Sequence, residues 1–103
     1  SDIFLKLSRI NAHINIMQNS ALSFSFLMDD KMEIVSQVKA ALESSFIVKY
    51  NTDLELVTIR HYDQQTIDFV TRGKEILLEQ KTRSTARFVL GQEDTATNTF
   101  KEV

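Results

Sequence analysis

The chain has no cysteine and no proline, and only two of its 103 residues are glycine. The absence of cysteine excludes disulfides, thiolate nucleophiles and thiolate metal sites, and a reducing compartment is the simplest setting. We therefore expect a cytoplasmic location. Loops that cradle phosphate need glycines where backbone amides approach the phosphate closely, so two glycines argue against an ATP site in this chain.

Long apolar runs and an excess of one charge are also missing. No segment approaches the roughly 20 apolar residues of a membrane span, and the first residues lack a basic-then-apolar signal pattern. Twelve basic residues against fourteen acidic ones give a formal charge of -2, which removes any general attraction to nucleic acid or anionic lipid. The 43% hydrophobic content is enough for a compact core of modest size.

Apolar spacing predicts short helices and strands along the whole chain. Helical intervals and strict alternation distinguish the two kinds of element. Turn chemistry at residues 51–53 indicates that the chain reverses direction there. The predicted helices cover residues 3–11, 30–45 and 63–72, and the predicted strands cover residues 13–17, 22–28, 46–50, 54–62, 76–80 and 85–90.

Two of the predicted helices carry recognisable end signals. Asp30-Lys31-Met32-Glu33 resembles a capping box, in which a side-chain oxygen bonds the first free amides of a helix. Asp63 can cap the third helix, and Gly73 stands where a left-handed residue usually closes one. These signals set the boundaries of the second and third helices.

The order of elements is αββαβ, then βαββ, then a polar stretch. Each set is part of a β-α-β-β-α-β unit. The first would be complete with one strand before residue 1, and the second with a helix and a strand after residue 91. We predict an α+β fold with an antiparallel sheet and helices on one face, divided into residues 1–52, 53–91 and a loose tail at 92–103. A sheet edge without its strand invites pairing with another chain.

A polar step of three residues joins the two predicted strands of the first hairpin. Gln18, Asn19 and Ser20 offer amide and hydroxyl groups that can bond a small ligand. On composition alone such a step is more often an ordinary turn. The step is nevertheless the one segment whose chemistry suggests a function.

These segments together resemble a known protein family. HINIMQNSALSFSFLMD, the following capped helix, VKYNTDLELVTIRHYD and GKEILLEQKTRSTARFVL are similar to the carboxy-terminal regulatory region of monofunctional bacterial aspartate kinases. The resemblance covers roughly residues 3–91. It implies tandem ferredoxin-like ACT domains (βαββαβ) that bind amino acids, the first lacking its first strand and the second incomplete.

The resemblance also implies that catalysis and regulation belong to different parts of the parent protein. In this family a kinase domain upstream transfers phosphate from ATP to the β-carboxylate of aspartate, with ATP and Mg²⁺ bound there. The present chain would then be a sensor without catalytic residues or a cofactor. Threonine or lysine would bind between ACT domains, and a homodimer would hold the kinase inactive.

The family's effector pocket maps onto the first hairpin. The matching positions are His13, Ile14, Asn15, Gln18, Asn19, Ser20, Ala21 and Leu22. Lysine-sensitive members carry acidic residues where Asn15 and Ala21 stand, and a partly buried ammonium group needs a carboxylate partner. Threonine or a small neutral amino acid is therefore favoured over lysine.

Other interpretations remain open. The pocket can be degenerate, which would leave a structural dimerisation module, and small RNA-binding α/β domains share the β-α-β-β-α-β order. The acidic balance and the lack of a basic Gly-aromatic strand count against RNA. His13 and His61 lack metal-ligand spacing, and the cluster of Lys81, Arg83 and Arg87 is typical of a solvated hairpin.

Overall fold

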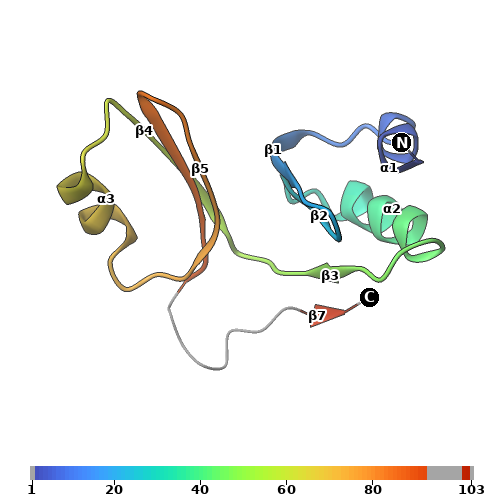
Figure 1. The fold of residues 1–103 in the computed structure, drawn as a ribbon. Coiled ribbons are helices and arrows are strands. Elements are labelled where there is room, and N and C mark those ends of the chain that lie inside the picture. Colours follow the sequence, from blue (N-terminus) through green and yellow to red (C-terminus); the bar gives the residue numbers. More distant parts are fainter. Residues whose placement is uncertain (1, 93–100, 103) are drawn as a thin grey trace. The chain divides into compact units, whose positions relative to one another are not determined.

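The computed structural model describes residues 2–92 and 101–102 of the chain, with helices and antiparallel strands (Figure 1). The fold is α+β, as the sequence predicts. The helices are α1 (Asp2–Ser8), α2 (Met32–Glu43) and α3 (Gln64–Thr71), and the strands are β1 (Ile14–Asn19), β2 (Phe24–Met28), β3 (Lys49–Tyr50), β4 (Glu55–Arg60), β5 (Ile76–Lys81), β6 (Thr85–Leu90) and β7 (Lys101–Glu102).

The chain divides into two compact units. Unit 1 holds the elements up to Tyr50 together with β7, and unit 2 holds the described residues from Asn51 to Gln92. Most of the tail predicted at 92–103 lies outside the described residues. The two described residues near its end form β7 rather than a loose segment. Unit 1 is thus assembled from two separate stretches of sequence.

Unit 2 is built on a three-stranded sheet with the order β4-β6-β5. Both outer strands run antiparallel to β6, so β4 and β5 run parallel to each other. Parallel strands need a crossover connection, and α3 supplies it. The result is a split β-α-β arrangement, in which the third strand lies between the two strands that the helix connects.

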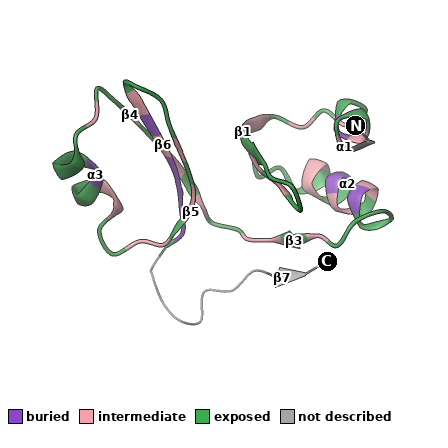
Figure 2. Ribbon diagram, viewed as in Figure 1, coloured by how far each residue is buried: buried purple, intermediate pink, exposed green. Residues whose placement is uncertain are grey.

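The core of unit 2 lies between this sheet and α3, which covers one face (Figures 1 and 2). Ala86, Phe88 and Leu90 alternate along β6, are at most 1% exposed and contact Ile67 of α3. Alternate residues of a strand share one face, so these three side chains meet the helix from one face of the sheet. Partly buried side chains of β4 complete the cluster.

Both ends of α3 follow the local chemistry predicted from the sequence. Asp63 is the N-cap, and its side chain accepts a hydrogen bond of 2.7 Å from the amide of Thr66. That backbone bond, and contact with the Thr66 side chain, lower the pKa of the Asp63 carboxyl below its ordinary value of 3.8. Gly73 follows the helix with φ of 72°, in the left-handed region that glycine adopts without strain.

The core of unit 1 lies among α1, α2 and β2. Leu7, Val38 and Leu42 contact one another and are 5–8% exposed. Figure 2 shows buried positions along α2. Ile34, Val38 and Leu42 recur at four-residue intervals, so one face of α2 packs on this core, as expected for the helix predicted at 30–45. The alternate residues of β2 pack on the same cluster, namely Phe24, Phe26 and Met28.

Lys6 joins α1 to the end of α2. Its ammonium group donates to the carbonyl of Ala41 at 3.0 Å and to the hydroxyl of Ser45 at 2.8 Å. The same group lies 5.9 Å from the ring centroid of Phe46. A cation near the last carbonyls of a helix compensates the negative end of its dipole.

The start of α2 differs from the predicted capping box. The N-cap is Lys31, and no side chain bonds the first amides of the helix. The carboxylate of Asp29 instead accepts a hydrogen bond from the Asn15 amide across the hairpin. The N-cap position falls on Lys31 and not on Asp30, and a lysine side chain has no acceptor for the helix amides, so the capping-box prediction is wrong.

The strand predicted at 46–50 is shorter in the structure. Only Lys49 and Tyr50 form β3, which pairs antiparallel with β7 in a register that sets Lys49 opposite Glu102. Phe46 and Ile47 remain 40% and 82% exposed. β3 and β4 pair with different strands, so residues 51–53 connect two sheets and do not join neighbouring strands of one sheet.

Candidate functional site

The polar step of the first hairpin contains a tight turn, and Ala21 and Leu22 form its two-residue loop. The amide of Ser20 donates to the carbonyl of Ser23 at 2.8 Å, and the two serine hydroxyls lie 2.8 Å apart in a hydrogen bond. The hydroxyl of Ser20 is therefore already used in closing the turn. Leu22 is 99% exposed, so its predicted place in the second strand is wrong.

Gln18 and Asn19 belong to β1 and not to the turn. Gln18 pairs with Ser25 and Asn19 with Phe24. Directly paired residues share a face, and neighbours along a strand alternate. Because Phe24 packs toward the helices, Asn19 lies on the helix side and Gln18 on the opposite side. The two amides do not converge on one ligand.

At the open end of the hairpin the structure brings other predicted residues together. The Asn15 amide donates to a carboxylate oxygen of Asp29 at 2.8 Å, and the amide of Asp29 donates to the carbonyl of His13 at 3.2 Å. Ile14 is half-buried, whereas His13 is exposed. A carboxylate thus lies beside Asn15, where the sequence alone indicated none.

The predicted site residues therefore form two groups. His13, Ile14 and Asn15 lie at the open end of the hairpin, and Gln18 to Leu22 lie at its tip. Asn19 follows Asn15 by four positions along the strand, which corresponds to about 13 Å. That distance exceeds the length of a small amino acid, so one such ligand does not lie between Asn15 and Asn19.

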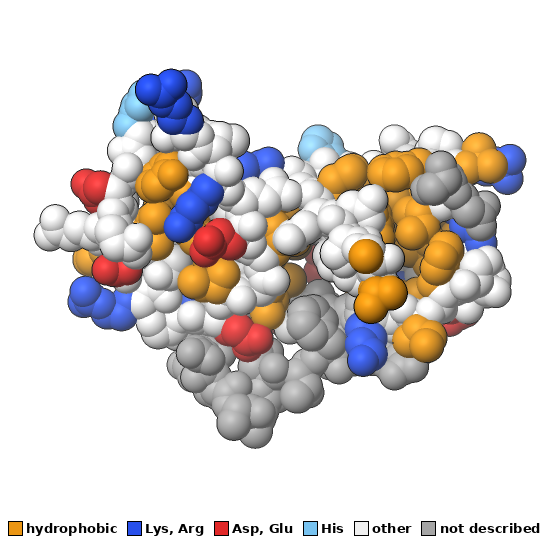
Figure 3. All heavy atoms as spheres, in the orientation of Figure 1, with side chains coloured by type: hydrophobic (Ala, Val, Ile, Leu, Met, Phe, Trp, Pro, Cys, Tyr) orange, Lys and Arg blue, Asp and Glu red, His pale blue; other side chains and the backbone are white. Residues whose placement is uncertain are grey.

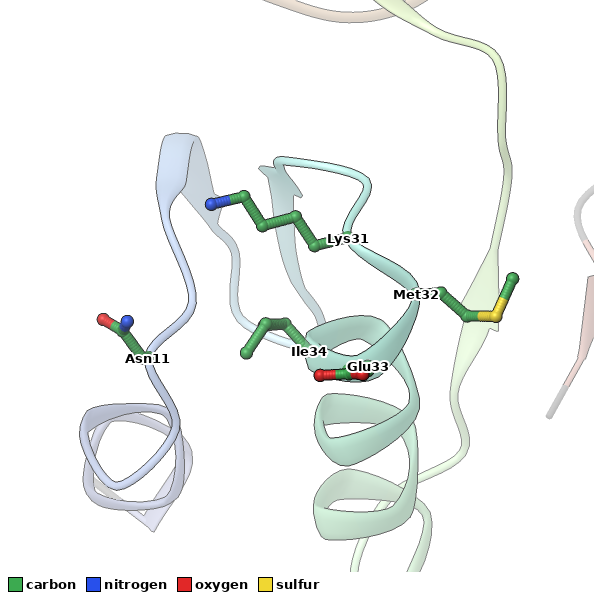
Figure 4. Close-up of a pocket in the computed structure, with 5 residues that line it drawn as sticks. All are labelled: Asn11, Lys31, Met32, Glu33 and Ile34. Atoms are coloured by element: carbon green, nitrogen blue, oxygen red, sulfur yellow. The ribbon is translucent and has the colours of Figure 1, made fainter.

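A cavity of about 490 Å³ lies at the open end, where the chain enters α2. Its lining consists of Asn11, Lys31, Met32, Glu33 and Ile34 (Figure 4). Lys31 and Ile34 extend toward the side of Asn11 in this view, and Met32 extends the other way. Sequence reasoning placed no ligand there, because Lys31 and Glu33 were assigned to a helix cap.

Aromatic side chains of the first hairpin could stack on nucleic-acid bases only from an open face of the sheet. Phe24 packs against Phe4 at 5.3 Å between ring centroids and against Phe26 at 5.7 Å, in the core of unit 1. These rings are not available to stack on bases. In the described part of the chain, no three His, Asp or Glu side chains are grouped to hold a metal ion.

The surface of unit 2 carries a charged hairpin, and the surface of unit 1 carries exposed apolar side chains. Lys81 forms an ion pair of 3.5 Å with Glu79 of the same strand, which agrees with a solvated hairpin. Among the described helices, none is long and apolar enough to cross a membrane. Apolar side chains gather over α1 and α2 in Figure 3, where Phe4 and Leu5 are 45% and 51% exposed.

Comparison with known proteins gave no match to a family model, a curated protein or a solved structure.

Proposed function

We propose that this chain is an amino-acid-sensing regulatory module of an aspartate kinase. The observation that carries the proposal is the split β-α-β sheet of unit 2, in which β6 lies between β4 and β5. This is the arrangement expected for the first part of a βαββαβ unit. It supports the ferredoxin-like ACT architecture that the sequence resemblance implies.

Unit 1 supports the same architecture from the other end. Its order is a helix, an antiparallel hairpin, a second helix and a strand. This order is the later part of a βαββαβ unit. Fold alone does not define a function, so the amino-acid ligand rests on the sequence resemblance and on polar groups of the first hairpin.

The proposed role is regulatory. Threonine or lysine binds the module, a homodimer transmits the signal, and a kinase domain elsewhere in the parent protein loses activity. The effector must bind the inactive state more tightly than the active one, because feedback is a coupling free energy between two sites. ATP, Mg²⁺ and the transfer step belong to that kinase domain and not to this chain.

Calorimetric titration of threonine and of lysine into the chain tests the proposal. We expect saturable heat for at least one of them at millimolar concentration and a rise in melting temperature that grows with ligand concentration. Glycerol at the same concentration is the control for non-specific stabilisation. If neither threonine nor lysine produces heat or a melting shift, direct sensing by this chain is ruled out.

A dimerisation module with a degenerate pocket is the second candidate. It is favoured by two observations at the hairpin tip: the opposite faces of Gln18 and Asn19 and the use of the Ser20 hydroxyl in the turn. Under this alternative, light scattering gives the mass of a dimer, and calorimetric titration shows no binding of threonine or lysine. Under the sensing proposal, both measurements are positive.

A further inference from the structure

We propose that the cavity at the start of α2 is where the free amino acid binds, held by both of its charged ends. This inference rests on the proposed function and moves its site from the hairpin tip to the open end. The cavity volume of about 490 Å³ falls within the range of small-molecule sites. A free amino acid fits within this volume.

The lining has the chemistry of a zwitterion site. Lys31 supplies an ammonium group for the ligand's carboxylate, and Glu33 supplies a carboxylate for the ligand's ammonium. Asn11 adds an amide that can bond either end, and Ile34 adds an apolar wall. Hydrogen bonds between ionised partners are shorter and roughly twice as strong as neutral ones.

Hydrogen bonds within unit 1 hold the rim of the cavity in place. Asn11 lies two residues before His13, and Lys31 lies two residues after Asp29. The carbonyl of His13 accepts from the amide of Asp29 at 3.2 Å, and the carbonyl of Asp29 accepts from the amide of Lys31 at 3.0 Å. The hydrogen bond from the Asn15 side chain to the Asp29 carboxylate joins the same two segments. These bonds hold the backbone segments that carry Asn11 and Lys31, and backbone already in place lowers the entropic cost of binding.

The hairpin tip lacks this combination of groups. Gln18 and Asn19 carry neutral amides, and the loop residues Ala21 and Leu22 are apolar. No acid or base stands between residues 14 and 28. The tip can bond a ligand only through neutral groups, whereas the cavity offers both signs of charge.

Charge-removing variants with matched controls test the assignment. Lys31→Gln and Glu33→Gln each remove one charge from the cavity. Arg9→Gln and Glu43→Gln remove the same charges from exposed positions outside it. For the amino acid that binds the wild-type chain, we expect the Kd to rise about tenfold or more in the two cavity variants. The two controls should stay near the wild-type value.

Ligands that lack one charge provide a second measurement. The N-acetyl derivative of the amino acid has no ammonium group, so Glu33→Gln should not weaken its binding further. The carboxamide derivative has no carboxylate, so Lys31→Gln should not weaken it further. This pairing of variant and ligand is specific to direct contact, because a variant that only disturbs folding weakens all three ligands alike.

The outcomes separate this inference from the proposed function. If the cavity variants bind like their controls while Gln18→Ala or Asn19→Ala loses the ligand, the site is at the tip and the cavity assignment is wrong. In that case amino-acid sensing still stands. If neither threonine nor lysine binds the wild-type chain, both proposals fail together.

Discussion

The two units contain the same α-β-β arrangement, and a comparison of their hairpins shows what a third strand adds. In unit 1 the turn is closed by Ser20 and Ser23, with an amide to carbonyl bond of 2.8 Å. In unit 2 it is closed by Thr82 and Thr85, again at 2.8 Å, and the Thr82 hydroxyl accepts from the Thr85 amide. The turn chemistry is thus repeated.

The hairpins differ in what lies beyond their second strand. β6 is paired on both edges, by β5 and β4, whereas β2 has a pairing partner only in β1 among the described residues. The consequence is visible in burial. Phe88 of β6 is 0% exposed, whereas the buried hydrophobic side chains of unit 1 retain 4–8% exposure. Two-stranded sheets are marginal in water, and three strands with a packed face are not.

The largest expected effect is on the unit 2 core. Phe88→Ala should cost about 3–5 kcal/mol, because it removes a fully buried aromatic ring between sheet and helix. Hydrogen exchange followed by NMR should show protection lost across β4, β5 and β6 and kept in α2. The matched change in unit 1, Leu42→Ala, should do the reverse. Loss of protection in both units from either change would show that they unfold as one body.

The next effect concerns the end of α3. Gly73→Ala should cost about 1 kcal/mol, because φ of 72° disfavours a side chain. An added Cβ meets no atom within 4 Å, so the cost comes from the backbone alone. Gly73→Asn should cost less, since asparagine tolerates this region. Chemical denaturation of the three proteins measures the order, and equal stability of the Ala and Gly proteins would contradict it.

A comparable effect in unit 1 should come from Lys6. Lys6→Met removes the bonds to the Ala41 carbonyl and the Ser45 hydroxyl while keeping most of the apolar stem. We expect a loss of about 1 kcal/mol and faster exchange in the last turn of α2. Lys6→Arg keeps the charge and should lose less. Unchanged exchange in α2 would mean that the ammonium group does not hold the helix end.

The smallest effect is a pH dependence at Asp63. Its folded-state pKa is lowered by the bond from the Thr66 amide, so the ionised form favours folding. That contribution is present above the unfolded pKa of about 4 and is lost as the pH falls through the lower folded value. Asn also caps helices but does not titrate. The stability advantage of wild type over Asp63→Asn should therefore shrink below about pH 4, as measured by melting temperature.

Elements defined by nearby residues could be predicted from the sequence. The cap at Asp63, the left-handed Gly73 and the β5–β6 hairpin depend on contacts within a few residues, and local patterns report these. The α+β class follows from the same patterns. In this part of the fold, local preference and tertiary structure agree.

Features that depend on distant contacts could not be predicted. Asp29 bonds Asn15 across the hairpin, although the two residues are 14 positions apart in the sequence. The strand register also determines which candidate residues lie together. Gln18 and Asn19 were expected in the turn, but they pair with Ser25 and Phe24 and therefore belong to β1. The cavity combines Asn11 with Lys31, which are 20 residues apart in sequence. Periodicity carries no information on such pairs.

The pairing of β7 with β3 has a consequence for the order in which the chain is made. Synthesis is vectorial, and domains fold as they emerge from the ribosome. The described elements of unit 2 are all translated before Lys101, so unit 2 can fold while the last strand of unit 1 is still missing. During that interval β3 has no β7 to pair with, and its edge stays exposed. Limited proteolysis of nascent chains near Tyr50 would measure the point in synthesis at which β7 pairs with β3 and protects it.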